Sequence, residues 1–227
     1  MCGRYKLVTD AHALIELFAV ANTRFDISEL RPRHNIAPSQ DVPIIRQTGA
    51  GREMAWARLG LVPSWSKEPR TKYSTINARL ETVADRPLYR NAFRHRRCLV
   101  PADGFYEWQQ SETRIPYHIC MPDTSVFAFA GLWERWEKGD IAFDSCTIIV
   151  TKANERMRPI HDRMPIIVHP RDYDRWLDVR TSNQTELMAC LKSAPSERLA
   201  ASPVSRYVNS PRHDDARCIE AAGEDGA

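Results

Sequence analysis

The second residue of the chain is a cysteine, and removal of the initiator methionine would make it the N-terminal residue. Cys2 would then carry a thiol and a free α-amine on adjacent carbons. These groups ordinarily titrate near ~8.5 and ~8, so both are partly nucleophilic at neutral pH. Such a 1,2-aminothiol reacts characteristically with an aldehyde, because the amine forms an imine and the thiolate then closes a thiazolidine ring. A cysteine at position 2 is by itself more often coincidental, and with Met1 retained only the thiol would remain.

Two polar segments could assist this chemistry. Asn77 and Arg79 are two residues apart, so on an extended chain their side chains share one face. An amide beside a guanidinium suits a sugar hydroxyl and a phosphate, although a turn-forming Asn next to a solvated Arg explains them as well.

The second segment is centred on Glu107, which lies among large aromatic residues in 105–108. Burial there would raise its pKa and make it a general acid, whereas an exposed strand position would leave it an ordinary carboxylate.

A third candidate segment is the loop 157–165, which presents His161 and Arg163 between Pro159 and Pro165. Histidine is the side chain best matched to proton transfer near pH 7. A single histidine is more often structural, but the two prolines restrict this loop and so favour a functional role.

The length fits one large domain or at most two small ones, and the composition is that of a soluble globular protein. The 227 residues carry a net charge of +3, which permits nucleic-acid binding without arguing for it. The six cysteines include no Cys-x-x-Cys pair, so we expect neither a metal site nor a disulfide framework, and Cys98, Cys120 and Cys146 should be buried free thiols. No signal peptide and no apolar stretch of membrane-spanning length is recognisable. We therefore expect a cytoplasmic protein with no membrane contact and no cofactor.

The helices and strands expected around these residues indicate an α+β fold. We expect a single domain built on a mostly antiparallel sheet that could close into a barrel. Thr9 or Asp10 can cap a helix with the apolar face Leu14, Leu17, Phe18 and Ala21. Further helices are expected at 85–95, 172–177 and 183–193, and strands at 42–46, 54–59, 98–101, 105–109, 117–121, 126–133, 146–151 and 165–169. The proline-rich segment 31–43 and residues 60–69 read as loops, and residues 212–227 read as a disordered tail.

Several long motifs resemble one family. They are Met-Cys-Gly-Arg at 1–4, Asn-Ile-Ala-Pro at 35–38, Gly-Leu-Val-Pro-Ser-Trp at 60–65, Ile-Asn-Ala-Arg-x-Glu-Thr at 76–82, Arg-Cys-Leu-Val-Pro-Ala-Asp-Gly-Phe-Tyr-Glu-Trp at 97–108, Pro-Ile-His-Asp-Arg-Met-Pro at 159–165 and Val-Asn-Ser-Pro at 208–211. Together they resemble the SOS response associated peptidase (SRAP) family of abasic-site processing proteins. The resemblance covers residues 2–211, so we expect one catalytic and DNA-binding domain over 1–211.

The resemblance implies an enzyme that removes Met1 autocatalytically and cross-links Cys2 to an abasic site in single-stranded DNA, with abasic-site lyase activity as a side path. It implies that Asn77 orients the reactants and that Glu107 and His161 move protons. The expected DNA-binding residues are Gly3, Arg4, Pro38, Trp65, Arg79, Trp108 and Arg163, of which Trp65 could equally belong to the core. We expect a monomer that associates with the nucleoid when it is bound to DNA.

Three other functions are weighed against this one. Glutamine amidotransferases with an N-terminal cysteine also begin Met-Cys-Gly, but the Asn-Gly of their oxyanion hole is absent from this sequence. A non-catalytic single-stranded DNA-binding module would have no need of Cys2. A protease acting in trans would need a peptide-binding groove, for which the sequence gives no sign.

Overall fold

Five strands of the larger sheet close into a ring. In the computed structural model, which describes residues 2–192 and 194–223, β4 (Asp41–Thr48) pairs with β5 (Gly51–Leu59) and β7 (Arg97–Ala102). β10 (Phe127–Lys138) pairs with β7 and with β11 (Ile141–Lys152). A parallel pairing of β11 with β5 completes the ring. The predicted α+β fold with a mostly antiparallel, barrel-like sheet is thereby confirmed.

The core lies within this barrel because every barrel strand contributes fully buried apolar side chains. Examples are Ile44, Met54, Leu99, Phe129 and Ile148. Burying each such side chain contributes about 1.5–3 kcal/mol relative to leaving it in water. A barrel also leaves few strand edges exposed, which limits pairing with other chains.

Short strands extend the larger sheet around the barrel. β2 (Val20–Thr23) pairs with β5, and β13 (Ile167–Val168) pairs with β10. β6 (Asn77–Arg79) runs parallel to β11, and β12 (Arg163–Pro165) runs antiparallel to it. Two of the candidate segments are thus attached to the same barrel strand.

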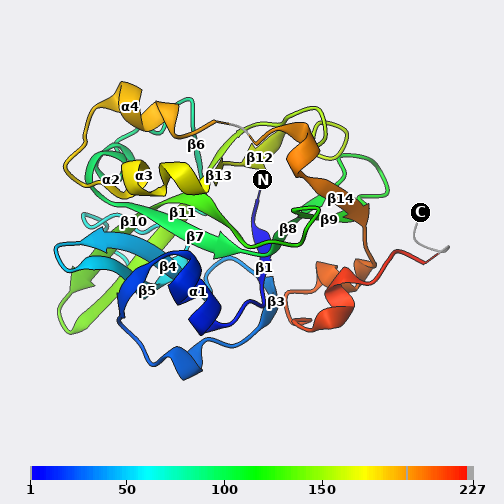
Figure 1. Ribbon diagram of the computed structural model, residues 1–227, viewed down its shortest axis with the longest axis horizontal. Helices are drawn as coiled ribbons and strands as arrows, with labels where there is room; N and C mark the ends of the chain where they lie inside the picture. The colour runs from blue at the N-terminus through cyan, green and yellow to red at the C-terminus, as the bar shows by residue number, and fades with distance from the viewer. Residues whose placement is uncertain (1, 193, 224–227) are drawn as a thin grey trace.

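The second sheet carries the N-terminal strand. Its order is β14 (Ala200–Pro203), β9 (Pro116–Cys120), β8 (Gly104–Trp108), β1 (Arg4–Leu7) and β3 (Arg33–Ile36). Asp103 alone separates β7 from β8, and its carboxylate accepts hydrogen bonds from Thr9 Oγ1 at 2.6 Å and from the backbone N–H of Thr9 and Val8. Figure 1 shows the N-terminal end of β1 at the centre of the view, between the barrel and this sheet.

The helices are short. They are α1 (Ala11–Leu17), α2 (Arg90–His95), α3 (Tyr173–Leu177) and α4 (Gln184–Ala189), with 3-10 turns η1 (Ile27–Glu29), η2 (Pro170–Asp172), η3 (Ser196–Arg198), η4 (Arg206–Asn209) and η5 (Ala216–Ile219). Asp10 caps α1 by accepting from the backbone N–H groups of His12 and Ala13. Among the described helices, none has the length and apolarity needed to cross a bilayer.

Several element boundaries differ from the predictions. α1 stops at Leu17, which is half-exposed, and Ala21 lies in β2, because Ala19 adopts a left-handed conformation that ends the helix. The predicted loop 31–43 contains β3 and the start of β4, since tertiary pairing overrides its proline content. The helix predicted over 85–95 begins only at Arg90. The strand predicted over 165–169 is split into β12 and β13, and the last helix ends at Ala189.

The prediction of a disordered tail is wrong for residues 212–223. The Asp214 carboxylate accepts from the backbone N–H of Asn35 at 2.8 Å and pairs with Arg33. Asn35 Nδ2 in turn donates to the His213 carbonyl at 2.7 Å. Small polar residues here are ordered by contacts with β3 that no local pattern indicates, and residues 224–227 lie outside the described part of the chain.

Candidate active site

The pairing of β1 with β8 sets the position of Cys2. Arg4 lies opposite Tyr106 in this antiparallel ladder, so continuing the register places Gly3 opposite Glu107. Cys2 is fully buried and Glu107 is 2 % exposed. Burial raises the pKa of the Cys2 thiol well above its ordinary value, and the nearby Glu107 charge raises it further. Cys98 and Cys146 are buried free thiols, as predicted, whereas Cys120 is a free thiol that is only half-buried.

The Asn77 amide reaches the same segment. Its Nδ2 donates to the Cys2 carbonyl at 2.9 Å. The pairing of β6 with β11 at Ile148 holds Asn77 there, and the Tyr89 hydroxyl donates to the Asn77 carbonyl at 3.2 Å. Asn77 Oδ1 is buried and accepts no hydrogen bond from any described residue. A buried acceptor of this kind indicates a place for a donor from a substrate or from the reacting amine.

Glu107 has the protonation behaviour of a general acid–base group. Burial raises its pKa from the ordinary value of 4.5 to about 7. The carboxyl is therefore partly protonated at neutral pH and can either give or take a proton.

His161 is brought to the end of β8. The backbone N–H of Gln110 donates to the Ile160 carbonyl at 2.9 Å, and Gln110 Nε2 lies 3.3 Å from His161 Nε2. His161 Nδ1 accepts from the Arg163 backbone N–H at 3.0 Å and is 2.9 Å from the Asp162 carboxylate. Burial lowers the pKa of His161, which favours the neutral ring. On protonation Nδ1 can donate to Asp162 instead, so the ring has a partner in both states.

The predicted phosphate-binding arginines have different surroundings. The Arg4 guanidinium donates to Asn35 Oδ1 at 2.7 and 2.9 Å and to the Val208 carbonyl at 2.7 Å, so it ties β1 to β3 and η4. Arg163 is paired with Glu81 at 2.6 Å. Arg79 is exposed, and its side chain has no hydrogen bond or ion pair to the described residues. Arg79 is therefore the best placed of the three to meet a phosphate.

The remaining residues predicted to contact DNA differ in their exposure. Pro38 and Trp65 are exposed, and Trp65, at 68 %, does not belong to the core. Trp108 is half-buried and its Nε1 donates to Asn209 Oδ1 at 2.7 Å. Gly3 is buried beside Cys2.

Sequence reasoning missed two features of the site. Tyr73 is 80 % exposed and lines a cavity of about 370 Å³ together with Pro38 and Thr75. Tyr73 could have been identified from its position just before the motif that contains Asn77. Asn35, from another matched motif, received no role, although it holds Arg4. Within residues 2–192 and 194–223, no three His, Cys, Asp or Glu side chains gather as a metal site.

A barrel with an attached sheet thus holds the buried Cys2 next to Asn77 and Glu107, with His161 at the end of β8. The chain belongs to the SOS response associated peptidase (SRAP) family, whose sequence profile matches residues 1–211.

Named relatives cover the chain almost completely. It is 37% identical to the abasic site processing protein YoqW of Bacillus subtilis over 225 residues, which are 97% of this chain and 100% of that protein. It is 32% identical to the abasic site processing protein HMCES of Xenopus tropicalis, over 86% of this chain and 68% of that protein. A crystal structure of a Bacteroides thetaiotaomicron protein superposes with a TM-score of 0.84 at 26% identity, covering 98% of this chain and 100% of the other.

Proposed function

We propose that this protein recognises abasic sites in single-stranded DNA and captures them covalently through Cys2. The observation that carries the proposal is the gathering of Cys2, Asn77, Glu107 and His161 near one end of β8, in a family whose relatives are named abasic site processing proteins. Nothing in an ordinary DNA-binding module requires a buried cysteine next to a carboxyl whose pKa is near 7.

The proposed reaction balances with the loss of one water. The ring-opened abasic sugar presents an aldehyde, and the Cys2 amine adds to its carbon to give a carbinolamine. Loss of water gives an imine, and the thiolate adds to the imine carbon while the nitrogen takes up the thiol proton. The product is a five-membered ring of sulfur, Cβ, Cα, nitrogen and the former aldehyde carbon.

The neighbouring side chains supply the proton transfers. Glu107 is suited to take the Cys2 thiol proton, since burial raises its pKa to about 7 and so makes its ionised form a stronger base than an ordinary carboxylate. His161 and Glu107 together can open the sugar, which requires a proton removed from the 1-hydroxyl and one delivered to the ring oxygen. The free Oδ1 of Asn77 can accept from the amine.

Two further activities follow from the same chemistry. Hydrolysis of the Met1–Cys2 peptide bond must free the amine, and we assign this step to the protein's own site. The imine also acidifies the adjacent CH₂ of the sugar, so β-elimination of the 3′ phosphate gives a lyase side reaction. Ring closure by the thiolate competes with that cleavage and protects the strand.

We place the DNA strand over Arg79 and the exposed residues Pro38, Trp65 and Tyr73. An exposed cation positions the phosphates, and bases stack on exposed aromatic rings. Arg4 and Arg163 enter this proposal as residues that hold the site together, because their guanidinium groups are bound to Asn35 and Glu81.

The test compares an uncleavable N-terminal tag with the same tag at the C-terminus, using abasic single-stranded DNA. An N-terminal tag turns the Cys2 amine into an amide, which does not condense with aldehydes, so only the C-terminally tagged protein should form an adduct. Intact mass should equal protein plus DNA minus one water. Equal yields of denaturation-resistant adduct would refute the proposal, and glutamine hydrolysis by the untagged protein would favour the amidotransferase alternative.

A further inference from the structure

A cavity of about 620 Å³ lies apart from the residues of the proposed reaction. It is formed where β13, η2 and α3 face the segment that joins α4 to η3, and the turn before β10 completes its wall. Its volume falls in the range of small-molecule sites, about 300–1,000 Å³.

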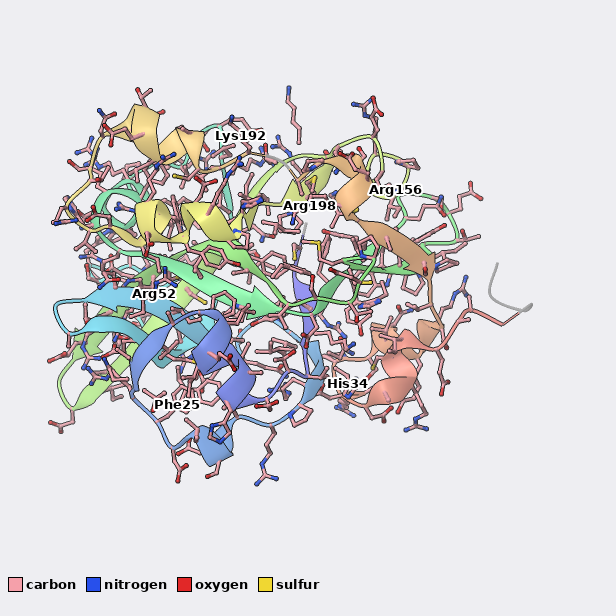
Figure 2. All side chains as sticks on the ribbon, in the orientation of Figure 1. Phe25, His34, Arg52, Arg156, Lys192 and Arg198 are labelled. Atoms are coloured by element: carbon pink, nitrogen blue, oxygen red, sulfur yellow. The ribbon has the colours of Figure 1, made fainter. Side chains whose placement is uncertain are left out.

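The lining of this cavity is strongly basic. Four arginine and lysine side chains stand against a single carboxylate among its described residues: Arg171, Arg175, Lys192 and Arg198 against Asp172. The excess of three positive charges equals the net charge of the whole chain, +3. Lys192 and Arg198 lie on the same side of the molecule in Figure 2. Such a concentration of one charge attracts anions.

The acidic groups nearby neutralise only part of this charge. Asp172 lies 3.6 Å from Arg171 Nε and 3.5 Å from Arg175 Nη1, so it is shared between them. Hydrogen bonds from Ser125 lower the pKa of the exposed Asp123 carboxyl, and the Arg198 charge adds to this in a minor way. Lys192 has no hydrogen bond or ion pair to the described residues.

The wall between these cations is apolar. Phe127, Val168, Tyr173 and Ala194 contribute to it and are each less than one-tenth exposed. A site for phosphate alone would not need such a wall, whereas a ligand that combines a flat ring system with a phosphate matches both parts.

Two hydrogen bonds connect the wall of the cavity to the loop that carries His161. Asn154 Nδ2 donates to the carbonyl of the lining residue Ala194 at 2.8 Å, and the adjacent Ala153 N–H donates to the Asp162 carbonyl at 2.9 Å. A ligand in the cavity would therefore contact a wall that also supports His161.

We propose that this cavity is a second, non-catalytic binding site that takes a nucleotide, with its phosphate against the basic rim and its base against the apolar wall. The nucleotide can be free or can belong to a bound strand. The two sources share this chemistry and are separated by experiment.

The experiment measures binding of ADP, and separately of an unmodified single-stranded oligonucleotide, to the full chain. The test variant is Lys192→Glu with Arg198→Glu, and the matched control is Arg24→Glu with Arg90→Glu, two exposed arginines that line none of the described cavities. Loss of two charge-assisted contacts should weaken binding about tenfold or more in the test variant only. Melting temperatures verify that all variants fold.

Each source predicts its own result. For a free nucleotide, ADP binds saturably, also after alkylation of Cys2, and only the test variant weakens it. For a strand, the salt dependence of oligonucleotide binding falls by about 1.4 in the test variant, since each single-strand phosphate contributes about 0.7. If test and control variants bind ADP and the oligonucleotide alike, or if inorganic phosphate competes as well as ADP, the proposal is overturned. Cross-link formation by the test variant should persist in either case, which separates this site from the proposed reaction.

Discussion

Replacing Glu107 by Gln should make stability less dependent on pH. Glutamine keeps the shape of the protonated carboxyl but cannot ionise. In the wild type, burial raises the pKa of Glu107 from 4.5 to about 7. A carboxyl whose pKa is raised on folding holds its proton more tightly in the folded state, so its ionisation opposes folding.

The magnitude follows from that difference in pKa. One pKa step corresponds to about 1.4 kcal/mol, so ionising Glu107 costs the folded state about 3 kcal/mol. This cost is absent below pH 4.5, grows as the pH rises, and is complete above about pH 7. The free energy of unfolding of Glu107→Gln, relative to wild type, should therefore rise by about 3 kcal/mol across this window.

Urea unfolding of both proteins at a series of pH values measures this directly. Taking the difference at each pH cancels groups that titrate alike in both proteins. Glu155→Gln removes the same charge from an exposed position and serves as the control. A difference between wild type and Glu107→Gln that stays flat from pH 4.5 to 8 would refute the raised pKa and the proton-transfer role with it. The rate of adduct formation should also fall by ~10²–10⁴ in Glu107→Gln.

Three further predictions concern the arginines and Cys2. Arg79→Ala should leave the melting temperature unchanged and reduce the salt dependence of single-strand binding by roughly 0.7; an unchanged dependence would make Arg79 structural. Arg4→Ala should lower the free energy of unfolding by about 2–3 kcal/mol, because Asn35 and Val208 lose a charged donor, and should barely alter the salt dependence. Cys2→Ser should still form an imine that borohydride traps but little stable adduct without it; wild-type yield of untrapped adduct would exclude ring closure by sulfur.

Much of the fold could be predicted because its strands are marked by their own residues. The alternating or continuous apolar runs of β7, β8, β10 and β11 indicate strands without any knowledge of their partners. β3 and the segment before η5 could not be predicted, since their residues are mostly polar and are ordered by distant contacts such as that of Asn35 with His213. Closure of the barrel depends on the pairing of β5 with β11, some ninety residues apart by the register Arg58 with Ser145, which no local pattern encodes.

The candidate site was also predictable only in part. Residue types and motifs indicated Cys2, Asn77, Glu107 and His161, because their chemistry is specific. The sequence could not show whether an arginine is free, since that depends on contacts made after folding. Arg4 is engaged by Asn35, which is 31 residues away, and Arg163 by Glu81, which is 82 residues away, whereas Arg79 points to solvent.

The burial of Cys2 bears on the order of the proposed steps. A thiol whose pKa is raised by burial is protonated at neutral pH and is a poor nucleophile. The α-amine must then attack the aldehyde first, and the thiol becomes reactive only when a base removes its proton. Glu107, buried on the neighbouring strand β8, is such a base: with a pKa near 7 it is partly ionised at neutral pH, and its ionised form is a stronger base than an ordinary carboxylate. Imine formation therefore precedes sulfur attack, and trapping of the imine in Cys2→Ser tests this order.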